Sequence, residues 1–250
     1  MWQRLPDSRG LKSMNKIEDA FKNKKAFIPF VTAGDPSLDV TRELILAMQE
    51  AGADLIEIGI PFSDPVAEGP VIQEADDRAL SAGVTTDKIF DMVDDIADKI
   101  HVPIVFMTYI NPIYVYGVEK FAKRAKACGA AGVIVPDVPF EEKEEIRGSF
   151  EAEGLVVISM VAPTSADRVR MIAKEAKGFL YCVSSLGVTG VRTEIGTAIG
   201  DLIQTVKEEC SIPCAIGFGI STPEQAEAMA KISDGAIVGS AIVKNCSKIR

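Results

Sequence analysis

Histidine is almost absent from this sequence, which contains 1 in 250 residues, His101. One histidine cannot build a histidine-rich metal site, and a serine–histidine catalytic pair would have to use this residue. His101 stands at the start of a strand-like run, His101-Val-Pro-Ile-Val. In parallel α/β folds, ligands bind at the opposite, carboxyl ends of the strands. We therefore expect neither a histidine-dependent reaction nor a metal site.

Signals for disulfides and membrane insertion are also lacking. The 5 cysteines show no Cys-x-x-Cys spacing. Their odd number argues against a disulfide framework or a zinc site and fits a reducing compartment. No apolar run approaches the ~20 residues that span a bilayer, and the N-terminus has no apolar core of the signal-peptide kind. These absences predict a cytoplasmic protein.

Positive charge is in short supply, because 27 Lys and Arg residues face 36 Asp and Glu residues, a formal net charge of -9. An acidic surface repels nucleic acid and anionic membranes, so neither is an expected partner. A small anionic substrate remains compatible with this charge, because a local group of backbone N–H donors can hold a phosphate.

What the sequence does contain is one repeating pattern, a short apolar strand, a turn and an amphipathic helix. The strand-like runs are apolar on both faces, as in buried parallel strands. They are Ala26–Val31, Asp54–Ile58, Ile104–Thr108, Gly132–Pro136, Val156–Met160, Phe179–Val183, Cys214–Gly217 and Ala236–Val238. The helical stretches between them are Leu38–Ala51, Asp87–Lys99, Val118–Cys128, Glu141–Glu153, Asp167–Lys177, Gly200–Glu209 and Pro223–Lys231.

Eight strands with helical returns favour an α/β fold of the (β/α)8 TIM barrel type over an open doubly wound sheet. The turn after the first strand reads Thr32-Ala-Gly-Asp-Pro, not the Gly-x-Gly-x-x-Gly of a nucleotide-binding open sheet. We expect one barrel domain over residues 14–250, with a short extra N-terminal helix. Residues 1–13 look detached from this domain and are expected to be a disordered or artificial extension.

The second predicted strand carries a carboxylate, Glu57, among apolar residues in Leu55-Ile-Glu-Ile-Gly. Burial of a carboxylate costs free energy unless the group is paired or used, and desolvation raises its pKa. A carboxyl with a raised pKa can both donate and accept protons near neutral pH. Glu57 is therefore a candidate acid/base. The alternative is a buried glutamate paired with a lysine or arginine of a neighbouring strand.

The segment that follows this strand, residues 61–70, holds three prolines in ten residues. They restrict the loop and are expected to hold Ser63, Asp64 and Glu68 over the barrel mouth. The alternative is a polar surface loop, and for Asp64 ordinary turn chemistry is the better explanation.

Glycines cluster at the ends of the last two predicted strands, in Gly217-Phe-Gly-Ile-Ser221 and Gly239-Ser-Ala241. Small residues let backbone N–H groups approach an oxyanion, and a helix beginning just after Gly239 would add its N-terminal dipole. Each cluster alone could be a tight turn. Both together, at the usual phosphate position of such barrels, predict phosphate binding.

The sixth predicted strand leads into residues 184–194, where Gly187 and Gly190 bracket Thr189. Two glycines suit a mobile lid that closes over a substrate, and the alternative is a merely flexible loop. Four further polar residues fall at strand ends and are either site or packing groups: Tyr109, Asn111, Asp137 and Tyr181.

Five segments of this chain resemble the signature segments of the tryptophan synthase α family. They are Phe30-Val-Thr-Ala-Gly-Asp-Pro36, Glu57-Ile-Gly-Ile-Pro-Phe-Ser-Asp-Pro65, Pro136-Asp-Val-Pro139, Gly187-Val-Thr-Gly190 and Gly217-Phe-Gly-Ile-Ser221. The likeness runs from about Met14 to the C-terminus, with the motifs in the family's order. The stretch from Glu57 to Pro65 is highly specific.

The resemblance implies a lyase that splits indole-3-glycerol phosphate into indole and glyceraldehyde 3-phosphate by retro-aldol cleavage. It implies that Glu57 transfers protons and that Glu68 accepts the indole N–H and stabilises positive charge on the ring. Tyr181 should lie near Glu57, and Thr189 should couple lid closure to the carboxylates. The pocket residues implied by the resemblance are Phe30, Tyr109 and Phe218 for indole, and Gly190, Gly219, Gly239 and Ser240 for phosphate.

The resemblance also implies a partner. Members of the family associate, as α2β2, with a β subunit that carries pyridoxal phosphate and receives indole through a tunnel. The loop of residues 61–70 would form part of that contact. The chain itself is expected to bind no cofactor.

One position departs from the family pattern, which reads Ala-Asp-Gly where this chain reads Ala67-Glu-Gly69. The carboxylate of Glu68 stands one methylene further from the backbone, and a misplacement of about 1 Å can cost about a hundredfold in rate. Two alternatives therefore stay open. One is a phosphate-binding barrel enzyme with a different substrate, and the other is a catalytically weakened partner that activates the β subunit.

Overall fold

One parallel sheet organises the chain. The structure, a computed structural model, describes residues 17–183, 192–217 and 219–246. Within these residues the strands pair in the order β5-β4-β3-β2-β1-β9-β8-β7-β6. Their bounds are β1 Ala26–Thr32, β2 Ile56–Gly59, β3 Ile104–Met107, β4 Gly132–Ile134, β5 Val156–Val157, β6 Ser159–Val161, β7 Leu180–Val183, β8 Cys214–Gly217 and β9 Gly235–Val238.

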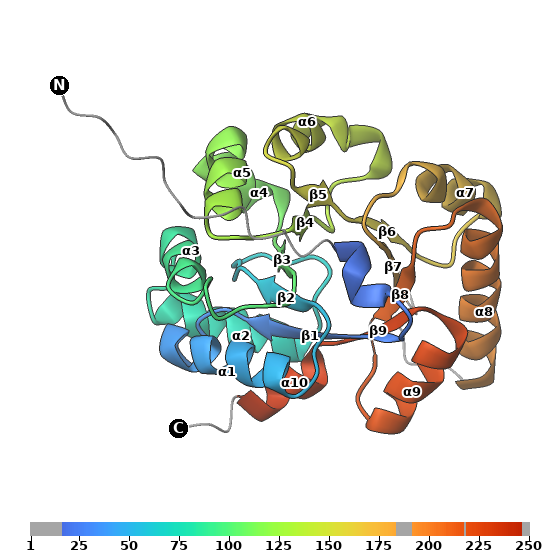
Figure 1. Cartoon of the computed structure of the whole chain (residues 1–250), viewed down its shortest axis with the longest axis horizontal. Helices are drawn as coiled ribbons and strands as arrows, with labels where there is room; N and C mark the ends of the chain where they lie inside the picture. The colour runs from blue at the N-terminus through green and yellow to red at the C-terminus, as the bar shows by residue number, and fades with distance from the viewer. Residues whose placement is uncertain (1–16, 184–191, 218, 247–250) are drawn as a thin grey trace.

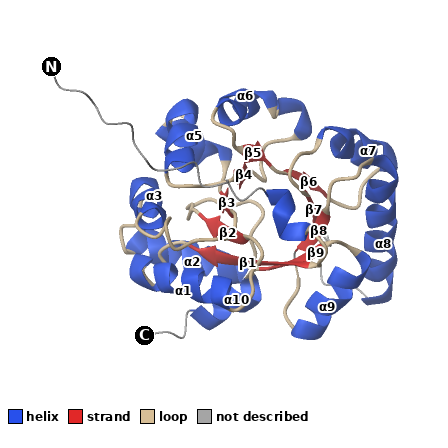
Figure 2. Cartoon of the chain, in the orientation of Figure 1, coloured by secondary structure: helices blue, strands red, loops and turns tan. Residues whose placement is uncertain are grey.

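The two ends of this order, β5 and β6, belong to one barrel strand. β5 pairs with β4 and β6 pairs with β7, and Ile158 alone separates them along the chain. The Ile158 N–H donates to the Val133 carbonyl at 2.9 Å, so the ladder continues through the break. With β5 and β6 counted as one strand, the described residues form a closed ring of eight parallel strands (Figure 2). The predicted (β/α)8 barrel is confirmed.

Helices return the chain along the outside of this ring (Figure 1). They are α1 Leu38–Glu50, α2 Pro70–Ser81, α3 Thr86–Asp94, α4 Ile110–Tyr116, α5 Val118–Ala127, α6 Glu144–Ala152, α7 Ala166–Glu175, α8 Arg192–Glu209, α9 Pro223–Ile232 and α10 Ser240–Cys246. Several starts are encoded locally. The side chains of Ser37, Thr85 and Thr222 cap α1, α3 and α9 by accepting a backbone N–H at 3.2, 3.4 and 3.3 Å.

A short 3-10 helix, η1 (Ile17–Phe21), covers the end of the ring where the strands begin. Ile17 packs so closely on Gly132 and Gly178 that a Cβ at either position would lie 3.3 Å from it. Phe21 packs on Phe179 with ring centroids 5.5 Å apart. This element matches the expected short N-terminal helix, and it leaves the opposite end of the barrel open for the site.

Side chains alternate between the inside and the outside of the barrel. The inward set fills the ring and includes Ile28, Leu55, Val105, Ala215 and Ile237, all buried. The outward set packs beneath the helices, with a large cluster under α1, α3, α5 and α6. These apolar side chains fill the barrel interior toward the end where the strands begin. An inward polar residue near the carboxyl ends of the strands therefore lies at the barrel mouth.

Several elements differ from the sequence expectation, including α3, which ends at Asp94 rather than Lys99. The predicted strand Val156–Met160 is divided at Ile158, and α8 begins at Arg192 rather than Gly200. Glycines at positions 196 and 200 lower the helix propensity of that stretch, so the sequence pattern predicts a later start for this helix. The helices α2 and α4 lie in segments for which the sequence pattern predicts no helix. α2 starts at Pro70, where the missing N–H of proline costs nothing.

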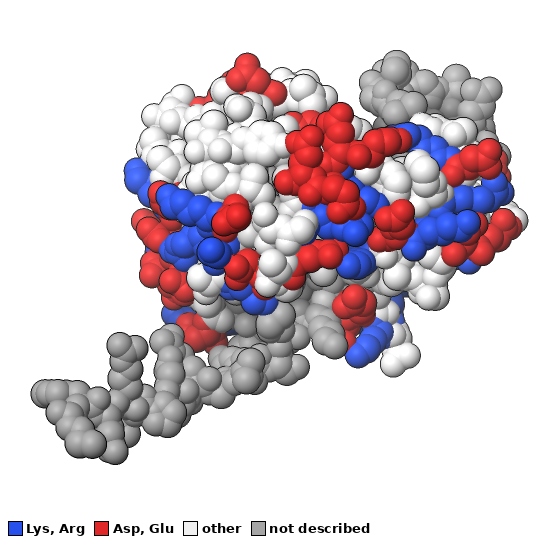
Figure 3. Space-filling view, turned by 90° about the horizontal axis from the view of Figure 1, so that it is seen from above, with Lys and Arg blue, Asp and Glu red and all other residues white. Residues whose placement is uncertain are grey.

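The surface fits the acidic composition. On the face drawn in Figure 3, lysine and arginine side chains alternate with aspartate and glutamate and form no single basic patch. None of the helices in the described part of the chain is long and apolar enough to cross a membrane.

Candidate active site at the barrel mouth

The first two strands bring an aromatic ring and a carboxyl group together inside the barrel. Phe30 on β1 and Glu57 on β2 are register partners, so their side chains point to the same side of the sheet. Both are buried, at 5% and 1% exposure. Gly59 makes room for the ring, because a Cβ there would lie 2.5 Å from Phe30 Cζ.

Glu57 is a buried carboxyl without a counter-charge. Neither of its oxygens has a hydrogen-bond partner among the described residues. The alternative of a glutamate paired with a neighbouring lysine or arginine therefore finds no support in this part of the chain. Burial raises the pKa of Glu57 to about 8, and the charge of Glu68 adds to the shift. Glu57 therefore holds its proton at neutral pH and can release it into a reaction.

The loop between β2 and α2 is fastened to Tyr109, which follows β3 and is 2% exposed. The Tyr109 hydroxyl donates to the Glu68 carboxylate and accepts the Ala67 N–H at 3.0 Å. Its ring also packs on Phe62, with centroids 5.5 Å apart. Burial raises the pKa of Glu68 to about 7, against the lowering effect of the Glu68 and Ala67 backbone N–H groups. The structure thus brings two predicted site residues, Glu68 and Tyr109, into direct contact.

Tyr181 on β7 completes the inner wall at 4% exposure. Its ring lies over Gly217, where a Cβ would come within 2.3 Å of the Tyr181 hydroxyl. Burial raises the pKa of Tyr181 well above its usual value, and the charges of Glu57 and Glu68 act in the same direction. Tyr181 therefore shares one electrostatic environment with both carboxyls and stays protonated.

The predicted phosphate residues that the structure describes lie at the ends of β8 and β9. Gly219 has a positive φ of 74°, which favours glycine. Gly239 follows β9 and faces Phe30, with 3.4 Å between a built Cβ and the ring, and Ser240 begins α10. The remaining predicted residues, Thr189, Gly190 and Phe218, lie outside the described residues.

Sequence reasoning missed Asp76, a third carboxyl of this region. Asp76 lies on the buried face of α2 at 5% exposure. Burial raises its pKa to about 8, the Glu68 charge adds to the shift, and the Phe62 N–H and the Thr32 hydroxyl oppose it. One signal was available, because Asp76 follows Ile72 at helical spacing and so falls on the apolar face.

Two buried hydroxyls were missed as well. Thr32 at the end of β1 and Thr108 just after β3 are 2% and 1% exposed. The Thr32 hydroxyl interacts with the Asp76 carboxyl, whereas the Thr108 hydroxyl oxygen has no hydrogen-bond partner among the described residues. Buried polar atoms without a partner, here those of Thr108 and Glu57, are typical of a site that a polar ligand completes.

The described residues contain no group of three or more histidine, cysteine, aspartate or glutamate side chains placed to hold a metal ion. His101 precedes β3, at the end of the barrel away from these carboxyls. Among the described residues, carboxyls and tyrosines are the groups placed for proton transfer at the mouth. Two carboxyls with pKa values of about 8 and about 7 can exchange protons with a substrate near neutral pH.

Fold and site together define a (β/α)8 barrel with two carboxyls of raised pKa, Glu57 and Glu68, at its mouth. The family model of the tryptophan synthase alpha chain matches residues 17–250. The chain belongs to the tryptophan synthase alpha chain family, the indole-3-glycerol-phosphate lyases.

Curated relatives match nearly the whole chain. The tryptophan synthase alpha chain of Lacticaseibacillus casei is 48% identical over 235 residues, which cover 94% of this chain and 88% of that protein. The alpha chain of Halalkalibacterium halodurans is 50% identical over 233 residues, covering 92% and 88%.

Solved structures agree with this assignment. The alpha subunit from Campylobacter jejuni superimposes with a TM-score of 0.85 at 32% identity and covers 92% of both chains. The alpha subunit from Legionella pneumophila str. Paris gives 0.84 at 38% identity, covering 93% of this chain and 88% of that chain. Tryptophan synthase from M. tuberculosis in an open form gives 0.81 at 32% identity, covering 91% and 88%.

Proposed function

We propose that the chain cleaves indole-3-glycerol phosphate at its barrel mouth, with Glu57 as the proton-transferring group and Glu68 as the partner of the indole ring. The observation that carries these roles is the state of Glu57. It is 1% exposed, its oxygens have no hydrogen-bond partner among the described residues, and burial raises its pKa to about 8. Such a group is costly for folding and useful for acid/base chemistry.

The reaction needs one proton delivered and one removed. Glu57 gives its proton to C3 of the indole ring, and the ring nitrogen takes up the positive charge. Glu68 accepts the indole N–H and stabilises that charge. A carboxylate then removes the proton of the side-chain hydroxyl, and the bond between C3 and the side chain breaks. Indole and glyceraldehyde 3-phosphate leave, and no oxidant or reductant is required.

The remaining side chains define the pocket. Phe30 and Tyr109 supply apolar and aromatic surface beside Glu57 and Glu68, which suits an indole ring. Phe218 is assigned to the same pocket by the family resemblance. Tyr181, protonated and close to both carboxyls, is assigned to the hydrogen-bonding wall of the site. These residues separate the indole end of the substrate from the phosphate end.

Phosphate is assigned to the turns after β8 and β9. Gly219 in its left-handed conformation and Gly239 beside Phe30 leave backbone exposed without side chains in the way. Ser240 adds a hydroxyl donor at the start of α10. Gly190 and Thr189 complete this end in the family pattern, with Thr189 coupling lid closure to the carboxylates.

A β subunit is the proposed partner, in an α2β2 complex that carries pyridoxal phosphate in the β chain. The loops after β2 and β3 lie on adjacent strands at the mouth. Large apolar side chains are exposed there, Val66 at 78% in the loop after β2, and Tyr114 at 47% and Val115 at 81% on α4, which follows β3. Exposed apolar groups at the end from which indole leaves fit a protein contact that receives the product.

Glu68 is the residue that supports a second candidate function, a catalytically weakened partner that activates the β subunit. Where the family pattern has aspartate, the longer side chain here reaches the Tyr109 hydroxyl. A carboxylate held by Tyr109 is either placed correctly for the indole N–H or held back from it. The first outcome gives an ordinary lyase, and the second gives a chain that activates the β subunit with little turnover of its own.

The deciding experiment measures indole release from indole-3-glycerol phosphate by the purified chain, with and without a tryptophan synthase β subunit. We expect turnover that the β subunit strongly stimulates. The Glu57→Gln variant keeps the shape of the side chain and should lose at least about a hundredfold in turnover.

Two results would contradict the proposal. Absence of indole in both conditions, from folded chain, would remove the lyase assignment for this chain and leave a different substrate or the activator role. Full activity of Glu57→Gln would leave the lyase in place and remove the role of Glu57. A control is Glu74→Gln on α2, which makes the same substitution at an exposed position outside the site.

A further inference from the structure

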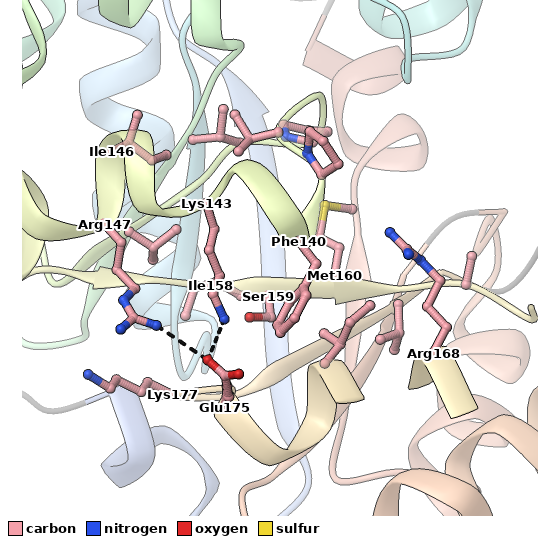
Figure 4. Close-up of a pocket in the computed structure, with 18 of the residues that line it drawn as sticks. Phe140, Lys143, Ile146, Arg147, Ile158, Ser159, Met160, Arg168, Glu175 and Lys177 are labelled. Carbon is pink, nitrogen blue, oxygen red and sulfur yellow. Dashed lines mark hydrogen bonds and ion pairs between the residues drawn. The ribbon is translucent and has the colours of Figure 1, made fainter. Parts of the chain in front are cut away.

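The turn that follows β4 carries a carboxylate, Asp137, to which the proposed reaction gives no role. The Val138 N–H closes this turn by donating to the Val135 carbonyl at 3.3 Å, and Pro136 restricts its backbone. A cavity between α6 and α7 lies on one side of the turn (Figure 4). Of residues 135–140, Asp137 is the one that does not line this cavity. Its side chain is directed instead toward the barrel mouth.

Asp137 holds the backbone next to Tyr109. Its two carboxylate oxygens accept the Ile110 N–H, at 3.0 and 3.3 Å. Ile110 is the first residue of α4, and the first N–H groups of a helix have no partner within the helix. On the other side of Tyr109, the Thr108 N–H donates to the Ile134 carbonyl of β4 at 3.1 Å. β4 and its turn therefore hold Tyr109 from both sides in an extended conformation, with φ -96° and ψ 163°.

The Tyr109 side chain carries this constraint to Glu68. Its hydroxyl donates to the Glu68 carboxylate and accepts the Ala67 N–H at 3.0 Å. A rotation of the peptide between Tyr109 and Ile110 would move the ring relative to the loop that holds Glu68. A misplacement of about 1 Å can cost about a hundredfold in rate. The bond from the Ile110 N–H to Asp137 opposes that rotation.

Asp137 also acts on Glu68 by its charge. Burial raises the pKa of Glu68 to about 7, and the charge of Asp137 adds to the shift. An asparagine in place of Asp137 would accept the Ile110 N–H without this charge. Asp137 therefore has two separable effects on Glu68, one of position through Tyr109 and one of charge through space.

We propose that Asp137 is a positioning residue of the lyase site, which holds the Tyr109 hydroxyl against the Glu68 carboxylate. The inference rests on the proposed function, because it concerns the group assigned to the indole N–H. It also gives a role to Pro136-Asp-Val-Pro139, a segment of the family likeness from which no site residue was drawn. The alternative is a cap that stabilises α4 and has no effect on Glu68.

The first test measures kcat and KM for indole release by the full chain. Asp137→Ala removes the acceptor of the Ile110 N–H and should lower kcat about fivefold, with KM within about twofold, because the phosphate end is untouched. Asp137→Asn keeps an acceptor oxygen and should stay within about twofold of the unchanged chain at its optimum pH. In the Tyr109→Phe background Asp137→Ala should cost less than about twofold, because the hydroxyl that it positions is gone. Equal losses in both backgrounds indicate a cap of α4 alone and overturn the proposal.

The pH profile gives a readout that a merely structural role does not move. Glu68 acts as a carboxylate, so its pKa sets the acid limb of the profile, and loss of the Asp137 charge lowers this pKa. Asp137→Asn should therefore shift the acid limb to lower pH and leave the alkaline limb, which Glu57 sets, in place. Asp167→Asn is the matched control, because Asp167 lies in the first turn of α7 with its side chain 99% exposed, and it should shift neither limb. An acid limb that stays in place in Asp137→Asn overturns the proposal.

The titration of Glu68 can also be followed without turnover, by NMR of the carboxyl carbons in glutamate-labelled chain, with Glu68→Gln to assign the signal. The pKa of Glu68 should be lower in Asp137→Asn than in the unchanged chain. It should be higher in Asp137→Ala than in Asp137→Asn, because a Tyr109 hydroxyl that is no longer held stabilises the carboxylate less. This second difference should vanish in the Tyr109→Phe background, and its persistence there overturns the proposal.

The lyase assignment and the role of Asp137 can fail separately. A folded chain without turnover contradicts the lyase assignment, and the NMR titration still decides whether Asp137 holds the Tyr109 hydroxyl. An active chain in which Asp137→Ala behaves like Asp167→Ala contradicts the role of Asp137 and leaves the lyase assignment in place.

Discussion

At the scale of single residues, the site depends on carboxyl groups kept in unusual surroundings. Glu57, Glu68 and Asp76 all have raised pKa values, and burial is the first cause in each case. The sequence predicted the first of these from one carboxylate inside an apolar strand. Asp76 was missed because Asp76-Asp77 resembles a solvated helix face, and its spacing from Ile72 was the one sequence signal that it is buried.

The contact between Tyr109 and Glu68 predicts a specific coupling. Tyr109→Phe removes the hydroxyl that bonds the Glu68 carboxylate and should lower turnover about tenfold. In the Glu68→Asp background the shorter side chain withdraws from Tyr109, so the same change should cost less. Indole release by the four chains of this double-mutant cycle measures the difference. Equal losses in both backgrounds would mean that the bond does not position the carboxylate.

Glu57 predicts how stability changes with pH. The folded state keeps the Glu57 proton up to about pH 8, whereas the ordinary value is 4.5. Between these values the folded chain binds more protons than the unfolded chain, so the free energy of unfolding falls as pH rises, by up to about 1.4 kcal/mol per pH unit. Glu57→Gln should flatten this slope in urea unfolding at pH 5, 6.5 and 8. Glu68 and Asp76 act with the same sign, and an unchanged slope would show that Glu57 is not the proton holder.

At the scale of elements, α2 follows the loop that carries Glu68, and it is one of the two helices that the sequence pattern did not predict. Its buried positions are Ile72, Ala75, Asp76 and Ala79, a face too small and too polar to give a clear apolar period. The strands were easier to predict from the sequence than α2, because each is a short run that is apolar on both faces. Eight strand positions and the barrel could therefore be predicted, whereas the helices beside the mouth depended on contacts between distant segments.

A buried ion pair joins α2 to the loop after β1 and predicts what fastens the helix. The Asp35 side chain is 2% exposed and accepts two bonds from Arg78, at 2.8 and 2.9 Å. Arg78→Leu leaves this carboxylate buried without its partner and should lower the free energy of unfolding by about 2 kcal/mol. The expected loss is smaller than for a fully buried ion pair, because the Arg78 side chain is half exposed. Lys231→Leu, which breaks an exposed pair with Glu227, should cost about 0.5 kcal/mol or less. Similar losses in denaturant unfolding would contradict this role of Asp35.

At the scale of the whole molecule, the two ends of the barrel have different roles. η1 closes the end where the strands begin, and the carboxyls, the glycine turns and the exposed apolar loops gather at the other. The sequence predicted this separation because a closed parallel barrel puts the ends of all its strands on one side. It did not predict which apolar residues stay exposed, since exposure of Val115 depends on α4, an element that the pattern did not indicate.

The partner surface gives the prediction that belongs to this scale. Val115→Asp places a charge in the exposed apolar area after β3, away from Glu57. The lyase rate of the chain alone should therefore stay within about twofold of the unchanged chain. The stimulation of that rate by the β subunit should weaken about tenfold. Ile232→Asp is the matched control, because Ile232 is 38% exposed at the end of α9 that precedes β9, on the far side of the barrel. Indole release is measured while the β subunit is titrated against a fixed amount of each variant. A docking surface at the mouth must be weakened by a charge placed there and not by one at the opposite end of the barrel. If the β subunit stimulates Val115→Asp as strongly as the unchanged chain, or if Ile232→Asp loses as much stimulation, the β subunit does not dock on the exposed apolar residues at the mouth.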